Sequence, residues 1–462
     1  MSRCTVTFVL VTYGHGELAA RCLDVLARHT GEPYEVVVVD SASPDGAGEW
    51  LERNLAGVTV LRMPHNLGFG AGCELGVRRA RGEFVCFLNA DVEVTAGWLE
   101  PLLELLRYND KAAAVAPVMT FPDGRLQEAG SMIGGDGFSR GWGDGEQCTD
   151  ELYPRVVDYA SAACLLVRRR AFYAAGGFCP DYHIAYYEDA DLQFELRRRG
   201  WQVWLQPESK VVHVRHGTSS TRTAERLSEI NRKTFRERWA AELAMRAPAV
   251  HAPRYPHRLH WLRDMAAPFS VLLLMHRVPA DGRELAAVRA WRAADPAAVV
   301  TVLAAGGTGA ASLRADGVEV VSDVDDAAAW GLDRAGCYDV VVTFGVAAHG
   351  ELGAAADDQP QAVRVFDFDG LAHVDYEHRF ATARDTTRRR ELGALAGRAR
   401  RDAVRALRDA DVVVCAQHPE ADWAGEINAD VPIHLTAGQP YEVTLDKVLV
   451  DCGLPPRPTG HG

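Results

Sequence analysis

The sequence predicts an α/β protein with at least two domains. The chain of 462 residues is longer than one ordinary hydrophobic core supports, and 48% of its residues are apolar, as in a globular protein. Short continuous apolar runs alternate with segments in which apolar residues recur at helical spacing. Such runs are typical of strands in a parallel sheet that helices cover on both faces. We therefore expect two domains, each built around a sheet of this kind.

The first half of the chain carries four of these apolar runs, separated by helical patterns such as 18–29. The runs cover residues 6–12, 34–40, 58–62 and 83–88. In parallel α/β sheets, ligands bind at the carboxyl ends of the strands. Side chains that directly follow these runs are therefore expected to converge on one cleft.

The rest of the first half is less regular. Residues 121–150 are rich in glycine and are expected to form a loop over the cleft, while residues 222–245 have the pattern of an arginine-rich amphipathic helix or helix pair. Further strands are expected at 156–168, 203–206 and 210–214. Closely spaced prolines then interrupt every pattern, which predicts a linker.

The second half has the same alternation without the motifs of the first half. Strands are expected at 270–275, 299–303, 318–321, 339–344, 363–366, 411–415 and 431–435, with a long helix at 379–408. This order predicts a second doubly wound sheet. The resulting domains are residues 1–246 and 269–462, joined by a linker at 247–268.

Charge and cysteine usage exclude several classes of protein. The net charge of -13 argues against a general nucleic-acid binder, whose affinity would come from neutralising phosphates. The ten cysteines contain no Cys-x-x-Cys pair, which argues against a zinc or redox site and favours a reducing, cytoplasmic setting. The N-terminus lacks the layout of a signal peptide, and no apolar run approaches the roughly 20 residues that span a bilayer.

Two acidic segments carry the most chemical information. Asn89-Ala90-Asp91 follows an apolar run, and Glu188, Asp189 and Asp191 lie at the start of a helical pattern. Carboxylates bind hard cations such as Mg²⁺ or Mn²⁺, and a free carboxylate can remove the proton of an acceptor hydroxyl. We therefore predict Asp91 as a metal ligand and Asp189 as a general base with Glu188 beside it. A turn or helix cap at Asp91, and acidic residues that only favour the helix macrodipole, are the alternatives.

Other polar residues follow the remaining predicted strands. Asp40 can accept a hydrogen bond from a pyrimidine or a ribose, and a cap of the next helix is the alternative, favoured if Asp40 is taken alone. The glycines of 66–72 let the backbone approach phosphate oxygens, or simply make a tight turn. His213 could complete a metal site, with His216 as its rival.

Together these motifs resemble the family 2 glycosyltransferases of the GT-A fold, a Rossmann-like nucleotide-diphospho-sugar transferase fold, and within them the rhamnosyltransferase-like subgroup of polysaccharide assembly. The resemblance covers roughly residues 4 to 240. It rests on 11–13, 37–40, 66–69, 87–91, 127–130, 176–178, 185–192 and 206–213.

The resemblance implies a metal-dependent, inverting hexosyltransferase and a role for each matched residue. Asp40 would bind the base or ribose, Asp91 the metal, and His213 the diphosphate or metal, while Asp189 would be the general base. The remaining residues expected around the nucleotide-sugar donor are Thr12, Tyr13, Asn66, Gly68, Asn89 and Asp191.

The second half is similar to the first, acceptor-side half of a GT-B glycosyltransferase of the family 4 type. The residues that carry this similarity are 273–277, 366–369 and 410–414. The resemblance implies a domain used for acceptor binding, for packing or for contacts in a homodimer.

The resemblance also sets expectations about substrates and setting. The donor would be dTDP-rhamnose or a UDP-hexose, and the acceptor a saccharide, a lipid-linked saccharide or a small natural product. From its charge, the arginine-rich stretch 222–263 is expected to touch an anionic membrane, peripherally at its inner face, or a diphosphate lipid, and a solvated helix face is the alternative. The rival functions are a catalytically silent binding or scaffold protein and a nucleotidyltransferase.

Overall fold

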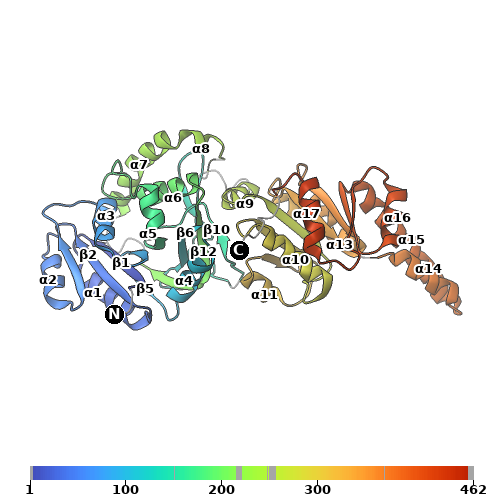
Figure 1. The fold of residues 1–462 in the computed structure, drawn as a ribbon, viewed down its shortest axis with the longest axis horizontal. Coiled ribbons are helices and arrows are strands. Elements are labelled where there is room, and N and C mark those ends of the chain that lie inside the picture. Colours follow the sequence, from blue (N-terminus) through green and yellow to red (C-terminus); the bar gives the residue numbers. More distant parts are fainter. Residues whose placement is uncertain are drawn as a thin grey trace. The chain divides into compact units, whose positions relative to one another are not determined.

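The computed structural model describes residues 4–149, 151–214, 221–246, 248, 256–368 and 370–455. The chain divides into two compact units, coloured blue to green and yellow to red in Figure 1. The first comprises Met1–Arg254 with Leu262–Ala266, and the second Tyr255–Trp261 with Ala267–Gly462. All ten cysteines lie in the described ranges, and none of them forms a disulfide.

One half of the first unit's sheet is parallel, as the sequence predicts. In the order β4-β1-β2-β3, its strands are β4 (Phe84–Leu88), β1 (Val6–Thr12), β2 (Tyr34–Asp40) and β3 (Val58–Arg62). Thr12 is the register partner of Asp40, so these strands end at the same level. The loops that follow them therefore start at one edge of the sheet.

The other half of this sheet corrects the expectation of parallel strands throughout. The strands beyond β4 are β11 (Cys164–Arg168), β6 (Ala112–Thr120), β12 (Gln202–His213) and β10 (Arg155–Val156), with β5 (Val92–Val94) on β12 and β7 (Leu126–Glu128) on β6. Strand β11 runs antiparallel to both of its neighbours. The two strands expected at 203–214 are one strand, whose register shifts between Gln206 and Lys210. Pro207 lies in this interval and cannot donate to a ladder, which explains the shift.

Helices cover the first unit's sheet. They are α1 (Gly16–His29), α2 (Ala47–Asn54), α3 (Phe69–Arg79), α4 (Leu99–Tyr108), α5 (Arg169–Ala175), α6 (Glu188–Arg198), α7 (Thr221–Arg238) and α8 (Ala240–Ala244). Helix α3 packs closely on β1 because a Cβ at Gly76 would lie 2.3 Å from Val9. The expected loop at 121–150 is more structured than predicted, since it contains β7, β8 (Ser131–Ile133) and β9 (Ser139–Gly141).

The second unit contains a seven-stranded parallel sheet in the order β15-β14-β13-β16-β17-β18-β19. Its strands are β13 (Ser270–Met275), β14 (Val299–Ala304), β15 (Glu319–Ser322), β16 (Val340–Phe344), β17 (Val363–Phe368), β18 (Val412–Cys415) and β19 (Ile433–Leu435). The main covering helices are α10 (Gly282–Ala294), α11 (Ala310–Ala315), α12 (Ala327–Leu332), α13 (Gly345–Leu352), α16 (His418–Ile427) and α17 (Tyr441–Asp451). The strand order reverses direction between β13 and β16, as in a doubly wound fold.

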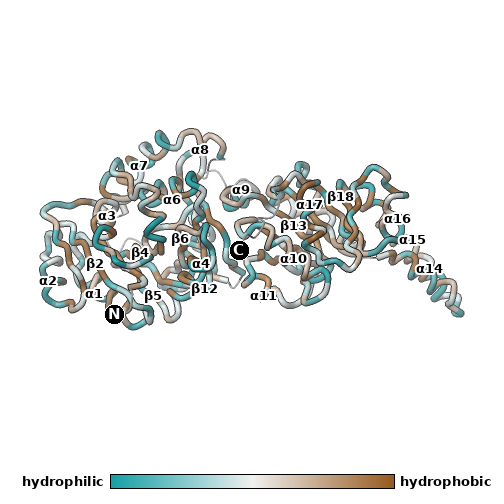
Figure 2. Tube along the Cα trace, viewed as in Figure 1, coloured by the Kyte–Doolittle hydropathy of each residue, from teal (hydrophilic) through white to brown (hydrophobic). Residues whose placement is uncertain are grey.

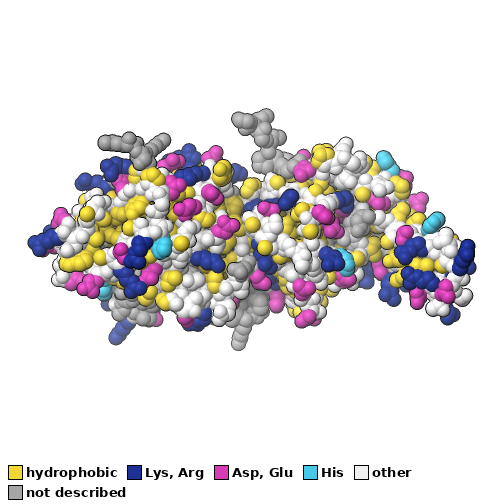
Figure 3. Space-filling model, turned by 90° about the horizontal axis from the view of Figure 1, so that it is seen from below, with side chains coloured by type: hydrophobic (Ala, Val, Ile, Leu, Met, Phe, Trp, Pro, Cys, Tyr) yellow, Lys and Arg dark blue, Asp and Glu magenta, His cyan; other side chains and the backbone are white. Residues whose placement is uncertain are grey.

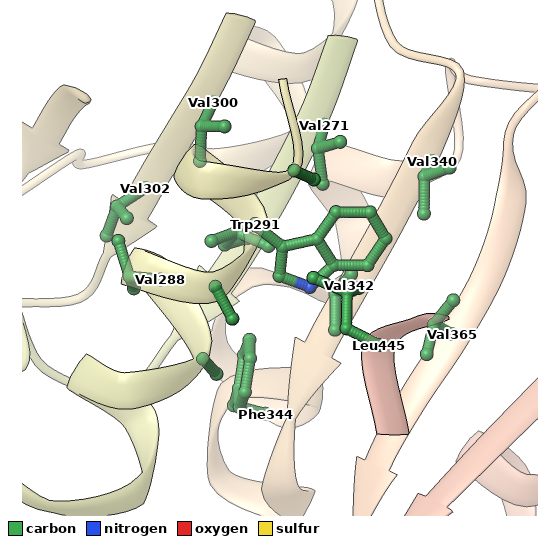
Figure 4. Close-up of a cluster of buried hydrophobic side chains, with 14 of the residues drawn as sticks. Val271, Val288, Trp291, Val300, Val302, Val340, Val342, Phe344, Val365 and Leu445 are labelled. Carbon is green, nitrogen blue, oxygen red and sulfur yellow. The ribbon is translucent and has the colours of Figure 1, made fainter. Parts of the chain in front are cut away.

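Trp291 of α10 lies at the centre of the second unit's core. Its side chain is fully buried, and Figure 4 shows the indole ring lying among Val271, Val342 and Leu445. In Figure 2 the brown colour of hydrophobic residues follows β13, in agreement with the burial of every residue of that strand.

One helical expectation is corrected in the second half. The long helix expected at 379–408 is two helices, α14 (Ala372–Thr382) and α15 (Thr386–Asp409). Asp385 causes the break because its side chain accepts a hydrogen bond from the amide of Arg388 and caps α15. In the expected linker, residues 256–264 form α9 (Pro256–Asp264), while 247 and 249–255 lie outside the described residues.

Several arginines of the stretch 222–263 form ion pairs with carboxylates of the protein. Arg238 pairs with Asp191, Arg246 with Asp158, and Arg263 with Asp264. Elsewhere charges of both signs are interspersed over the face in Figure 3, where arginines gather over the α14 and α15 end. No helix in the described ranges is both long and apolar enough to pass through a bilayer.

Candidate functional site

A cavity of about 630 Å³ lies at the carboxyl edge of the first unit's parallel strands. Seven of the residues expected at the site line it, namely Thr12, Tyr13, Asn66, Gly68, Asn89, Glu188 and Asp189. Four others do not line it, namely Asp40, Asp91, Asp191 and His213. No Lys or Arg is among the described residues that line this cavity. Apart from four tyrosines, the ionisable side chains among these lining residues are His15, Glu188 and Asp189.

Side-chain hydrogen bonds tie together the loops that follow β1, β2 and β3. Ser43 accepts a hydrogen bond from the amide of Gly14 at 2.6 Å. The hydroxyl of Ser41 donates to Asn66 Oδ1 at 3.1 Å and accepts from the amide of Leu67 at 2.7 Å. These polar side chains make one continuous wall from three separate strand ends.

Asp40 supports this wall from behind. Its carboxylate is 5% exposed and accepts hydrogen bonds from both the amide and the hydroxyl of Ser43. Helix α2 lies against it, because a Cβ at Gly48 would be 2.0 Å from Asp40 Oδ2. In this structure Asp40 therefore stabilises the loop that follows β2 through its hydrogen bonds with Ser43.

The opposite wall of the cavity is formed by the segment that leads into α6. Three of its residues, Ile184, Tyr186 and Tyr187, have positive φ angles of 64°, 80° and 71°. Such angles are unfavourable for side chains of this size. Gly68 meets this segment closely, since a Cβ there would lie 2.4 Å from the carbonyl oxygen of Ile184.

Asp189 is held by two backbone amides. Its Oδ2 accepts a hydrogen bond from Ala162 at 3.0 Å and its Oδ1 one from Ala190 at 2.9 Å. Burial raises the pKa of Asp189, and these two hydrogen bonds oppose that rise by stabilising the carboxylate.

Glu188 differs from its neighbour. Burial, followed by the negative charge of Asp189, raises the pKa of Glu188 to about 8. Its Oε2 has no hydrogen-bond partner within the described part of the chain. Near neutral pH this raised pKa favours the protonated form of Glu188, while the two amide contacts favour the charged form of Asp189.

The sequence interpretation missed a third carboxylate, that of Glu128 in β7. It accepts a hydrogen bond from the amide of Ser161 at 2.8 Å, next to the Ala162 amide that holds Asp189. Burial is the main cause that raises the pKa of Glu128; the charge of Asp189 raises it further and His213 lowers it. Glu128 belongs to the Gln127–Gly130 motif, which was the only signal for it.

Asp91 and His213 lie beside each other. Asp91 Oδ1 is 3.4 Å from His213 Nε2, while His213 Nδ1 is 2.6 Å from Gln127 Oε1. The Gln127 amide nitrogen donates to the His213 carbonyl, so its oxygen faces the ring and Nδ1 carries the hydrogen. The neutral ring then presents the lone pair of Nε2 towards a carboxylate, a donor pair that suits a divalent cation.

No cluster of three or more His, Cys, Asp or Glu side chains in the described ranges could by itself hold a metal ion. The rival ligand His216 lies outside the described residues.

Asp191 lies away from the cavity, in contrast to its expected place around the donor. Its Oδ1 accepts hydrogen bonds from the hydroxyl of Tyr182 at 2.9 Å and from Trp239 Nε1 at 2.7 Å. Arg238 lies 2.8 Å from the same oxygen. These contacts join α6 to α7 and the start of α8.

The fold is α/β with a mixed sheet, and its strand-end cavity has polar loops on one side and paired carboxylates on the other. This combination is that of a sugar-nucleotide transferase of the GT-A type. Comparison with known proteins makes this class more specific. Residues 7–175 match the sequence profile of Glycosyl transferase family 2.

Two curated relatives agree with this match. The chain is 30% identical over 251 residues to the N-acetylglucosaminyl-diphospho-decaprenol L-rhamnosyltransferase of Mycobacterium tuberculosis H37Rv, covering 49% of this chain and 81% of the relative. It is 30% identical over 221 residues to the pre-mycofactocin glycosyltransferase of the same organism, covering 47% of this chain and 44% of that relative. This chain therefore belongs to glycosyltransferase family 2, and its activity is sugar transfer.

A solved mannosyltransferase from Pyrobaculum calidifontis, in complex with GDP-Man and Mn²⁺, aligns over 58% of this chain and 72% of its own. The identity is 21% and the TM-score 0.39. The family match ends within the first unit, so the similarity of the second unit to half of a GT-B enzyme stays a prediction.

Proposed function

We propose that this protein is an inverting glycosyltransferase that moves a sugar from a nucleoside diphosphate to an acceptor hydroxyl, with Asp189 as the general base. The observation that carries the proposal is the fixed carboxylate of Asp189 in the wall of the cavity, opposite the loops at the strand ends. A hydroxyl attacks an anomeric carbon readily only when its proton is removed as the bond forms.

The neighbouring residues prepare Asp189 for this role. The amides of Ala162 and Ala190 hold both of its oxygens, so its orientation is set before substrate binds. Glu188 stays protonated near neutral pH because of its raised pKa. It then adds no second charge to the site. The acceptor hydroxyl passes its proton to Asp189, its oxygen bonds to the anomeric carbon, and the nucleoside diphosphate leaves with the bonding pair on the opposite face.

The donor's diphosphate needs a counter-charge that the described lining of the cavity does not supply, since that lining contains no Lys or Arg. Asp91 and His213 are the residues that would hold Mg²⁺ or Mn²⁺, with oxygens of the diphosphate completing the coordination. A bound cation would stabilise the negative charge on the departing diphosphate.

The names of two relatives indicate which donors and acceptors to test first. One is named as a rhamnosyltransferase that acts on a decaprenol diphosphate-linked sugar, and another modifies pre-mycofactocin. We therefore place dTDP-rhamnose first among the donors and UDP-hexoses next. A lipid-linked saccharide is the first acceptor to try and a small natural product the second. The second unit would serve acceptor binding or contacts between two copies of the chain.

The test is release of nucleoside diphosphate from a panel of dTDP- and UDP-sugars with Mg²⁺ or Mn²⁺, comparing the wild type with Asp189→Asn. Loss of a general base lowers the rate by about 10²–10⁴-fold. Asp181→Asn is a matched control, since Asp181 is exposed and lies outside the cavity. Metal-dependent donor binding without turnover, in the presence of acceptors, would instead favour a catalytically silent binding protein. Equal rates for wild type and Asp189→Asn would remove Asp189 as the base.

A further inference from the structure

One face of α7 connects the cavity to the interior of the first unit. Its residues recur every four positions, which places them in one row along the helix. Thr223 and Leu227 line the cavity, and Phe235 and the following Trp239 are buried in a hydrophobic cluster. Asn231 lies in the middle of this row and is 1% exposed.

The amide of Asn231 binds the segment that precedes the two carboxylates. Its Nδ2 lies 3.0 Å from the carbonyl oxygen of His183, 2.8 Å from that of Ala185 and 3.0 Å from that of Tyr186. Its Oδ1 accepts a hydrogen bond from the amide of His183 at 3.0 Å. One side chain therefore contacts four backbone groups of the segment 183–186, and the two hydrogens of Nδ2 are shared among three carbonyl oxygens.

This segment needs an external partner. Three of the seven non-glycine residues with positive φ in the described chain lie at 184–187, immediately before Glu188. Residues in such conformations persist only where the surroundings hold them. A second contact also fixes the segment, because the carbonyl of Ile184 accepts a hydrogen bond from the amide of Phe69 at 2.6 Å.

We infer that Asn231 is a positioning residue that holds the 183–187 segment in its strained path and thereby sets Glu188 and Asp189 at the cavity wall. This inference rests on the proposed function of Asp189. No other side chain of similar size fits the contacts. Aspartate would turn an anionic oxygen towards three carbonyl oxygens, and alanine would leave four backbone groups without their partner.

The first readout does not depend on activity. Hydrogen exchange of the backbone amides at 183–189 is expected to become faster in Asn231→Ala and faster still in Asn231→Asp. Leu243→Ala is the control, since Leu243 is buried in the same hydrophobic cluster and is absent from the contacts of this segment. Unchanged exchange in Asn231→Ala would overturn the inference, whatever the substrate.

The second readout is kinetic. Displacement of a reacting group by about 1 Å can cost ~10²-fold in rate, so kcat of Asn231→Ala is expected to fall by 10- to 100-fold. The donor KM should stay close to that of the wild type, and the pH–rate profile should move because the surroundings of both carboxylates change. Equal losses of kcat in Asn231→Ala and Leu243→Ala would show a merely structural role and overturn the inference. If Asn231→Ala is impaired while Asp189→Asn is fully active, Asn231 is still a positioning residue, but Asp189 is not the general base.

Discussion

His213 Nε2 lies 3.4 Å from Asp91 Oδ1, and the sheet fixes this separation. Strand β12 pairs with β5 so that His213 is opposite Val92, and the amide of Val214 donates to the carbonyl of Asp91 at 3.0 Å. The imidazole is turned towards Asp91 by Gln127 on β7. Two potential ligands are thus set by backbone pairing, and a third residue sets the tautomer.

If Asp91 and His213 hold a metal ion as proposed, we predict that Gln127→Ala weakens the affinity for that ion without removing a ligand. Loss of a residue that orients a ligating histidine typically costs ~10–100-fold in metal affinity. The measurement is a Mn²⁺ titration of nucleoside diphosphate release, in which the half-activating concentration should rise by that factor. Gln147→Ala, at an exposed position, should leave the titration unchanged. An unaltered titration in Gln127→Ala would argue that His213 is not a ligand.

A second prediction concerns Asp191, whose contacts are structural. Asp191→Ala would leave the Tyr182 hydroxyl, the Trp239 indole N–H and Arg238 without their shared partner. The free energy of unfolding should therefore fall by about 3 kcal/mol. The donor KM of the folded variant should stay near the wild-type value, because Asp191 does not line the cavity. Urea unfolding measures the loss of stability, and donor kinetics measure KM. A raised donor KM at unchanged stability would indicate that Asp191 contributes to donor binding.

Continuous apolar runs predicted β1 to β4 and all seven strands of the second unit. Most of these strands are buried on both faces and need apolar residues throughout, whereas β3 and β19 are partly exposed. The antiparallel direction of β11 could not be predicted in this way, since direction is set by chain paths that lie outside the strand itself. The short strands β8 and β9 carry no periodic pattern long enough to read.

The same limit applies to the site. Residues at the carboxyl ends of strands, such as Thr12 and Asn89, were expected at the cavity because ligands of parallel sheets bind at that edge. Gln127 and Asn231 could not be placed, since they act on backbone or side chains 86 and 45–48 positions away. The motif 127–130 contributes to the family resemblance but gives no role to Gln127, and nothing in the sequence around Asn231 distinguishes it from a solvated amide.

A third prediction tests the core of the second unit. Trp291 is fully buried, so Trp291→Ala should lower the free energy of unfolding of this unit by ~3–5 kcal/mol. Leu332→Ala is the control, because Leu332 is 58% exposed in the same unit and should cost little. Denaturant unfolding followed by circular dichroism measures the difference, and similar midpoints for the two variants would contradict the packing in Figure 4.

The last prediction follows from the raised pKa of Glu188, about 8 against an ordinary value of 4.5. Between these values the folded protein holds a proton that the unfolded chain has released, so this group's contribution to stability is complete below pH 4.5. It is lost as the pH rises towards 8, at up to about 1.4 kcal/mol per pH unit. Glu188→Gln cannot ionise and escapes this loss. Its stability relative to wild type should therefore increase from pH 5 to pH 8 in urea unfolding, whereas exposed Glu104→Gln should show a constant difference. A constant difference for Glu188→Gln as well would mean that Glu188 is already ionised at neutral pH, and that Asp189 does not carry the pair's charge alone.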